Sequence, residues 1–278
     1  MYHNILTQKD YPEYSQIKKI VKLLLEFIEV DTIYFSKHFE EPSNIGIITV
    51  IISKSSPHFY DDIYEYAWKL FKSHPEFSFV IFDKASVKEE LNEGNPFFIM
   101  NCSESELIYS TTTPKSIVNI EKINAKKLIE KTKKRFQIHT SYSLIIDRDL
   151  RFYRSHNFLM AAYNIHQQFR YLFISVSSFL TGEYRIEQSL KRQQENLRMF
   201  SSLLGNAFDP DKEEEWFVRK QLDKACSAIQ WNKEIEPISK ETVELASIKL
   251  DWFKKEIGRF FQEYLKKTKE IFEDHGNK

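Results

Sequence analysis

Residues 33–52 read IYFSKHFEEPSNIGIITVII, and this stretch decides the fold of the first half of the chain. β-Branched and aromatic side chains are dense over Thr32–Phe35 and over Ile45–Ile52, and a polar segment, Glu40–Asn44, separates them. Such side chains favour an extended backbone, whereas Glu, Pro, Ser and Asn in succession are typical of a turn. The stretch therefore predicts two strands joined as a β-hairpin.

The segments around the hairpin alternate between helical and extended patterns. The patterns predict helices over residues 14–29, 61–73 and 87–92, a strand over residues 77–82, and short extended runs over residues 96–100 and 107–109. Residues 110–116 are rich in Thr, Ser and Pro and interrupt both patterns. We therefore expect an α+β domain over residues 1–115.

Beyond residue 116 the apolar residues recur at helical spacing throughout. Helices are predicted at about residues 121–148, 152–180, 184–204, 212–232 and 239–273. Gly182 is expected to end the second of these helices, while Asp211 and Ser239 are expected at the starts of the last two. Long helices with short connections predict an antiparallel all-α bundle over residues 116–278.

The composition excludes several classes of protein. Forty basic and forty acidic residues balance, so no global positive field draws the chain to nucleic acid or to an anionic membrane. The longest apolar runs are far shorter than the roughly 20 residues of a membrane span, and the polar start is not that of a signal peptide. We expect a cytoplasmic protein without membrane contact. Only two cysteines and six glycines are present, so neither a cysteine metal site nor a glycine-cradled cofactor is predicted.

The hairpin segment resembles the minimal nucleotidyltransferases, in which a strand leads into Gly-Ser and the next strand carries an Asp-x-Asp pair that holds magnesium. Here Ser36 and Lys37 stand at the Gly-Ser position, and Asn44 and Gly46 stand where the two aspartates belong. A second segment, EGNPFFIMNCSESELIY at residues 93–109, is similar to a later segment of the same family. The resemblance implies the transferase fold, whereas the missing carboxylates predict no metal site, no cofactor and no nucleotidyl transfer.

The helical half resembles HEPN domains, the four- or five-helix bundles often fused to such transferases. The likeness rests on NFLMAAYNIHQQFRYL at 157–172, FLTGEYRIEQSL at 179–190 and EEEWFVRKQLDKACSAIQWNKEIEPISKE at 213–241. In the family, each of these segments carries a short polar motif. The first motif is preserved here as Ile165-His166-Gln167, whereas Glu187–Leu190 and Ile229–Trp231 replace the second and the third. The resemblance implies a bacterial nucleotidyltransferase-HEPN protein that pairs as a homodimer through its helical domain.

An antiparallel bundle can bring the three HEPN-like segments together around one groove. The residues expected there are His166, Gln167, Arg170, Gln188, Gln230 and Trp231. Amides, one cation and one indole ring can bind a base, a phosphate and a stacked ring, but they lack a strong nucleophile. The alternative is that these groups only satisfy one another inside the bundle, because His166 shares its helix face with Ala162, Phe169 and Phe173.

Other charged residues have a functional and a structural interpretation. Arg151 and His156 match the Arg-x4-His spacing of HEPN ribonucleases, but they precede the first HEPN-like helix instead of opening a later one. Asp61 and Asp62 could supply metal ligands, yet acidic residues are also usual in the first turn of a helix. The best candidate for an RNA-facing patch is the basic run Lys126, Lys127, Lys131, Lys133, Lys134 and Arg135.

These observations predict a non-catalytic protein that binds a nucleotide or RNA through its helical half. Two alternatives remain. The first is a HEPN ribonuclease toxin that depends on His156 or His166. The second is a purely structural interaction module without affinity for nucleotides.

Overall fold

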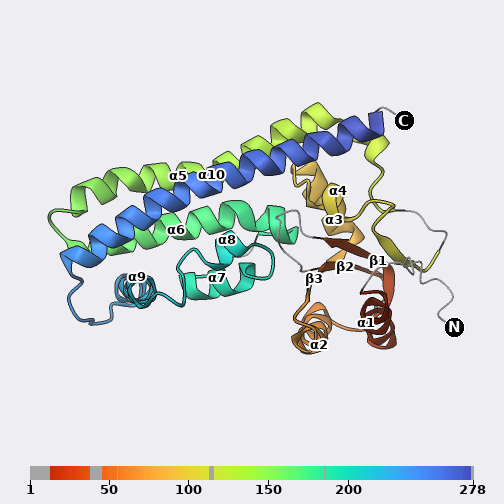
Figure 1. The fold of residues 1–278 in the computed structure, drawn as a ribbon, viewed down its shortest axis with the longest axis horizontal. Helices are drawn as coiled ribbons and strands as arrows, with labels where there is room; N and C mark the ends of the chain where they lie inside the picture. Colours follow the sequence, from red (N-terminus) through yellow and green to blue (C-terminus); the bar gives the residue numbers. More distant parts are fainter. Residues whose placement is uncertain (1–12, 38–45, 55, 113–115, 185, 277–278) are drawn as a thin grey trace. The chain divides into compact units, whose positions relative to one another are not determined.

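The computed structural model describes residues 13–37, 46–54, 56–112, 116–184 and 186–276 (Figure 1). Its contacts divide the chain into two compact units, residues 1–129 with 268–278 and residues 130–267. The elements of the first part of the chain are α1 (Tyr14–Phe27), β1 (Val30–Lys37), β2 (Gly46–Ile52), α2 (Tyr60–Lys72), β3 (Phe77–Asp83), α3 (Lys84–Asn92), α4 (Phe97–Asn101), β4 (Leu107–Ser110) and η1 (Ile120–Lys122). The remaining elements are α5 (Ala125–Tyr153), α6 (Phe158–Thr181), α7 (Leu190–Leu197), α8 (Ser202–Gly205), α9 (Glu213–Trp231) and α10 (Lys240–Gly276).

The predicted pairing of the two strands is confirmed. β1 runs antiparallel to β2, with Tyr34 opposite Thr49 and Lys37 opposite Gly46. β2 pairs in parallel with β3, and β1 pairs antiparallel with β4, so the order in the mixed sheet is β3-β2-β1-β4. The expected turn at residues 40–44 lies outside the described residues. The first unit is therefore built on a small four-stranded mixed sheet, as an α+β fold requires.

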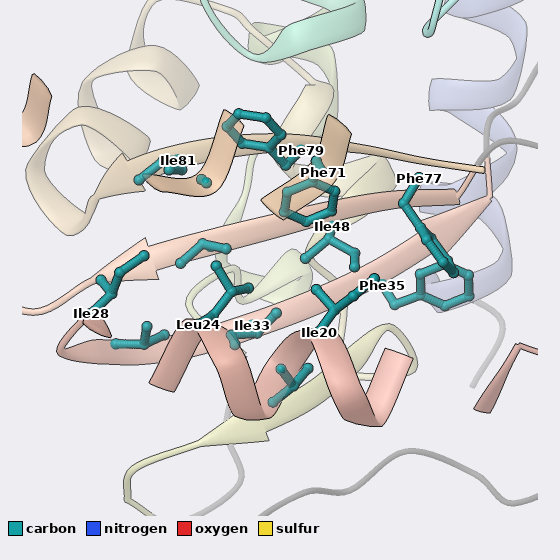
Figure 2. Close-up of a cluster of buried hydrophobic side chains, with 14 of the residues drawn as sticks. Ile20, Leu24, Ile28, Ile33, Phe35, Ile48, Phe71, Phe77, Phe79 and Ile81 are labelled. Atoms are coloured by element: carbon teal, nitrogen blue, oxygen red, sulfur yellow. The ribbon is translucent and has the colours of Figure 1, made fainter. Parts of the chain in front are cut away.

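Helices cover both faces of this sheet. On one face α1 and α2 pack against alternate strand residues in a cluster of buried apolar side chains that includes Ile20, Ile33 and Phe79 (Figure 2). On the other face Phe82 meets the α4 rings Phe97 and Phe98 edge to face or tilted. Because side chains alternate along a strand, burial on both faces turns the strands into continuous apolar runs. This explains why periodicity alone did not distinguish the two faces.

One predicted element is wrong. Residues 96–100 were expected to be extended, but Phe97–Asn101 forms the short helix α4. The Asn95 side chain accepts a hydrogen bond from the Phe97 amide at 3.1 Å, and Asn101 donates to the Phe97 carbonyl at 2.8 Å. These local amide bonds and the burial of the two rings outweigh the preference of aromatic residues for strands.

The second half of the chain is helical, as predicted, but one of the expected helices differs. α5 and α10 run antiparallel, and their register is fixed by Phe136 stacked on Phe261 and by an ion pair of 3.2 Å between Asp147 and Lys254 (Figure 1). The helix expected over residues 184–204 is instead two helices, α7 and α8, preceded by an irregular segment. Within the described ranges, no helix is long and apolar enough to cross a membrane.

Three predicted helix ends can be compared with the structure. Gly182 follows α6 with a φ of 80°, a left-handed conformation that suits glycine. Ser239 precedes α10, and its hydroxyl accepts a hydrogen bond from the Thr242 amide at 3.2 Å. Both predictions are confirmed. α9 begins one residue later than expected, because Lys212 and not Asp211 occupies the position before its first turn.

Gly46 stands where the resemblance puts the second metal-binding aspartate, and the core leaves no room for a side chain there. A Cβ atom at this position would lie 2.3 Å from Phe35 Cε2 and 3.0 Å from Phe77 Cδ1. The two rings meet edge to face at 6.0 Å, and both are buried (Figure 2). Gly46 is therefore required by close packing of aromatic rings. Its partner position, Asn44, lies outside the described residues.

We expect Gly46→Ala to lower the free energy of unfolding by about 1–3 kcal/mol, because Phe35 must move to admit the methyl group. Gly258 in α10 is a matched control, since a Cβ there has no neighbour within 4 Å. Gly258→Ala should raise stability by about 0.5–1 kcal/mol through helix propensity. Urea unfolding of both variants measures the difference. Equal effects of the two substitutions would contradict this account of Gly46.

Candidate functional site

The three HEPN-like segments come together in the second unit. α6 carries His166, Gln167 and Arg170, the segment before α7 carries Gln188, and the end of α9 carries Gln230 and Trp231. His166 and Gln167 are buried, whereas Gln188 and Gln230 are exposed. Trp231 lies on the surface with 69% of its area exposed, and the next residue, Asn232, ends the helix in a left-handed conformation.

Hydrogen bonds connect the α6 residues in one direction. The Arg170 guanidinium can only donate, and Nη1 donates to Gln167 Oε1 at 3.4 Å. This orients the Gln167 amide Nε2 toward His166 Nδ1, 3.3 Å away, which therefore accepts. The other ring nitrogen, Nε2, lies 3.2 Å from Asp223 Oδ1, to which it donates. A chain of four side chains thus ends on a carboxylate of α9.

Asp223 is the centre of this network, and sequence reasoning missed it. In addition to His166, its carboxylate accepts hydrogen bonds from Arg219 Nη1 at 3.0 Å, Ser189 Oγ at 3.1 Å and the amide of Leu190 at 2.8 Å. Ser189, at the start of α7, makes no capping bond of its own. Asp223 therefore caps α7 from a distance of more than 30 residues in sequence. The available signal was the i,i+4 spacing of Arg219 and Asp223 on one helix.

Two opposing effects act on the pKa of Asp223. Burial of the carboxylate raises the pKa, but the hydrogen bonds from His166 and the Leu190 amide, with the charge of Arg219, outweigh it. The pKa of Asp223 therefore lies below its usual range. The same burial lowers the pKa of Arg219, whose guanidinium lies 4.0 Å from the centre of the Trp216 ring.

The other predicted residues hold the connection between α6 and α7. Arg170 Nε donates to the Glu187 carbonyl at 3.2 Å, and Gln230 Nε2 donates to Gln188 Oε1 at 3.3 Å. Three of the six predicted residues, His166, Gln167 and Arg170, thus share one chain of hydrogen bonds, whereas Gln188 and Gln230 form a separate exposed pair. Trp231 follows this pair at the end of α9.

The hydrogen bonds of this arrangement hold α6, α7 and α9 together. Cys226, the nearest thiol, accepts a weak hydrogen bond from Gln167 Nε2 at 3.5 Å, and burial raises its pKa to about 11. The thiol is therefore protonated at neutral pH and is a poor nucleophile. Among the described residues, no group of three or more His, Cys, Asp or Glu side chains could hold a metal ion. The donors and acceptors of His166 and Asp223 are satisfied internally.

The Arg-x4-His pair lies elsewhere, at the end of α5. Arg151 Nη2 forms an ion pair with Asp147 at 2.9 Å, and the exposed His156 Nδ1 lies 2.8 Å from the Phe152 carbonyl. The His156 ring also stacks on Phe152. Each member of the pair thus has local partners of its own.

The residues at the Gly-Ser position have structural partners, and the two aspartates considered as metal ligands are exposed. Ser36 Oγ donates to Asn101 Oδ1 at 2.7 Å, and Lys37 lies 3.6 Å from a Glu13 carboxylate oxygen. Asp61 and Asp62 are exposed in the first turn of α2, as the helix-dipole interpretation predicts.

The basic run of α5 divides into two groups. Arg135 is buried, donates to Ser178 Oγ at 3.2 Å and lies 4.1 Å from the centre of the Tyr184 ring. Lys131 is half-buried. The exposed group is Lys126, Lys127, Lys133 and Lys134, which we call the lysine patch. Since 126 and 133, like 127 and 134, are two turns apart, the four side chains lie on one side of the helix.

A groove of about 510 Å³ lies elsewhere in the second unit, between α9 and α10. It is lined by Phe208, Lys212, Glu214, Glu215, Val218, Leu245, Ile248, Lys249 and Trp252. Both of its lysines pair with Glu215, at 3.4 and 2.6 Å, so its positive charge is largely neutralised. None of the six residues predicted for a ligand groove lines it.

Comparisons with known proteins give no family assignment. No protein-family model matches the sequence, and no curated protein matches it either.

We expect Asp223→Asn to lower the free energy of unfolding by about 2–4 kcal/mol at pH 7, because Arg219 then loses its buried counter-charge. The folded-state pKa of Asp223 is depressed, so its contribution is fully present above the unfolded value of about 4 and is lost as pH falls through the folded value. Wild-type stability should therefore fall more steeply below pH 4 than that of the variant. Urea unfolding from pH 2.5 to 7 measures this, with the exposed Asp251→Asn as control.

Proposed function

We propose that this chain is a non-catalytic RNA-binding protein of the nucleotidyltransferase-HEPN type, and that its helical half contacts RNA through the lysine patch of α5. The observation that carries the proposal is the exposure of Lys126, Lys127, Lys133 and Lys134 on one side of a single helix. One acidic residue, Glu130, lies among them. The patch therefore carries four basic side chains and one acidic one, within a chain whose net charge is zero.

The dimensions of the patch suit a phosphate backbone. Eight residues separate Lys126 from Lys134, which is about 12 Å along a helix. Four ammonium groups along this length can contact several phosphates of one RNA strand at once. Lysine binds phosphate as a point charge without reading base identity. We therefore propose binding that depends weakly on sequence and strongly on salt.

The absence of catalysis is supported by three features already described. Gly46 is closed in by Phe35, so a carboxylate at that strand position has no space. The His166 and Asp223 side chains are engaged in anchoring α7. The nearest thiol, Cys226, is protonated at neutral pH. Binding without turnover is consistent with all three.

The test is fluorescence anisotropy with a labelled single-stranded 20-nucleotide RNA at 50 and 200 mM NaCl. A variant with Lys126, Lys127, Lys133 and Lys134 all changed to Gln should bind at least tenfold more weakly at 50 mM salt. The slope of log affinity against log salt concentration should be smaller in magnitude by about 2–3 for this variant. Each lost contact between a lysine and a phosphate removes about 0.7 from that slope.

The matched control changes four exposed lysines that lie apart from one another in the sequence: Lys19, Lys88, Lys220 and Lys233. This variant has the same net charge, so it should retain most of the affinity if the patch, not the overall charge, matters. Equal losses in both variants, or no binding by the wild type at 50 mM salt, would refute the proposal.

The same samples test the ribonuclease alternative. The RNA should remain intact after incubation with the wild-type protein, as judged on a denaturing gel. If the wild type cleaves the RNA and His156→Ala or His166→Ala abolishes the cleavage, the protein is a ribonuclease and our proposal is wrong.

A further inference from the structure

The groove between α9 and α10 has an apolar lining. Phe208 and Val218 line it and are buried, whereas Leu245, Ile248 and Trp252 of α10 are 36, 68 and 36% exposed. The three α10 residues follow the i, i+3, i+7 spacing and therefore share one face of the helix. Single exposed apolar residues are ordinary on a protein surface. Three that line the same groove indicate a binding site.

The two lysines of the groove already have counter-charges. Lys212 pairs with Glu215 at 3.4 Å and with Asp209 at 3.6 Å, and Lys249 pairs with Glu215 at 2.6 Å. Burial raises the pKa of Glu215, but the hydrogen bonds from Lys249 and from the Asp209 amide outweigh it, so this pKa lies below its usual range. Glu215 is therefore charged at neutral pH. Both lysines are neutralised, and the groove is a poor site for an anion.

Glu214 is the charged residue of the groove that remains. It is exposed, and within the ranges that the structure describes it forms no ion pair. The positive end of the α9 dipole, which could attract an anionic ligand, is already occupied by the three glutamates of the first turn, Glu213–Glu215. The groove thus combines an apolar lining with one carboxylate that is able to pair with a cation.

We propose that this groove binds a small organic cation, whose apolar body packs on Ile248 and Trp252 and whose ammonium or guanidinium group pairs with Glu214. Burial of the apolar body supplies most of the affinity. The carboxylate orients the ligand and selects the sign of its charge, as the few polar groups of a largely apolar site commonly do.

The dimensions of the groove favour a small molecule over a protein segment. The α10 wall from Leu245 to Trp252 is about 10 Å long. The volume of about 510 Å³ lies within the range of about 300–1,000 Å³ that is usual for small-molecule sites. A stable protein interface buries about 800 Å² on each partner, which is more than a groove two helical turns long can offer.

The inference is independent of RNA binding. The lysine patch belongs to α5, and none of its four residues lines the groove. The variant in which these four lysines are changed to Gln should therefore bind a small cation as the wild type does. A loss of cation binding in this variant would contradict the assignment to the groove.

NMR titration of the full-length chain at pH 7 and low salt tests the proposal with two probes, 4-phenylbutylammonium and 4-phenylbutyrate. The probes share one apolar body and carry opposite charges. We expect the ammonium to bind with a dissociation constant of about 1 mM or below. The carboxylate should bind at least about threefold more weakly, because Glu214 attracts the first probe and repels the second. Failure of the ammonium to bind, or an equal or higher affinity for the carboxylate, would overturn the inference.

A charge variant tests the role of Glu214. Glu214→Gln should remove most of the preference for the ammonium. Glu213→Gln is the matched control, because Glu213 is the adjacent exposed glutamate, loses the same charge and does not line the groove. Equal effects of the two substitutions would show that overall charge, and not the groove, selects the probe.

An apolar variant tests the α10 wall. Ile248→Ser should weaken the binding of both probes at least about threefold, because it removes apolar surface from the groove. Ile186→Ser is the control, since Ile186 is 66% exposed, close to the 68% of Ile248, and lies outside the groove. Circular dichroism checks that both variants are folded. Unchanged affinity in folded Ile248→Ser would place the probes elsewhere and overturn the inference.

Discussion

The half-buried carboxylate of Asp223 is the constraint on which the middle of the helical unit depends. A carboxylate with 22% of its side chain exposed is costly unless its oxygens are satisfied, and here donors from α6, α7 and α9 converge on it. Because the Leu190 amide is one of these donors, the start of α7 is tied to α9. Removing the carboxylate would leave Arg219 and His166 buried without their acceptor, so the three elements are energetically coupled.

This coupling changes how the polar residues of α6 are understood. His166, Gln167 and Arg170 have polar groups that could bind a ligand. These groups instead form hydrogen bonds with one another and with the segment before α7, and the chain of bonds ends on Asp223. A polar network that is satisfied internally specifies one packing arrangement of the helices. The surface residues therefore become the better candidates for contacts with other molecules, and α5 carries two groups of them.

α5 shows how one helix can divide its surface. Its first turns expose lysines, and its middle exposes Ile138, Tyr142 and Ile145. On the same helix Thr132 and Ser143 are buried, and Ser143 donates a hydrogen bond to Gln168 of α6. The exposed lysines are consistent with polyanion binding, which would leave the internal network of Asp223 intact.

The sequence by itself determined the elements that depend on neighbouring residues. The strands on either side of residues 38–45, the helices of the second half, and the ends of α6 and α10 follow from local propensity and from capping by Gly182 and Ser239. It did not predict α4, where burial of Phe97 and Phe98 overrides strand propensity. Only the tertiary structure revealed that Gly46 is closed in by Phe35 and that Asp223 caps α7. In each case the deciding contact joins residues distant in the chain, and such contacts leave no periodic pattern in the sequence.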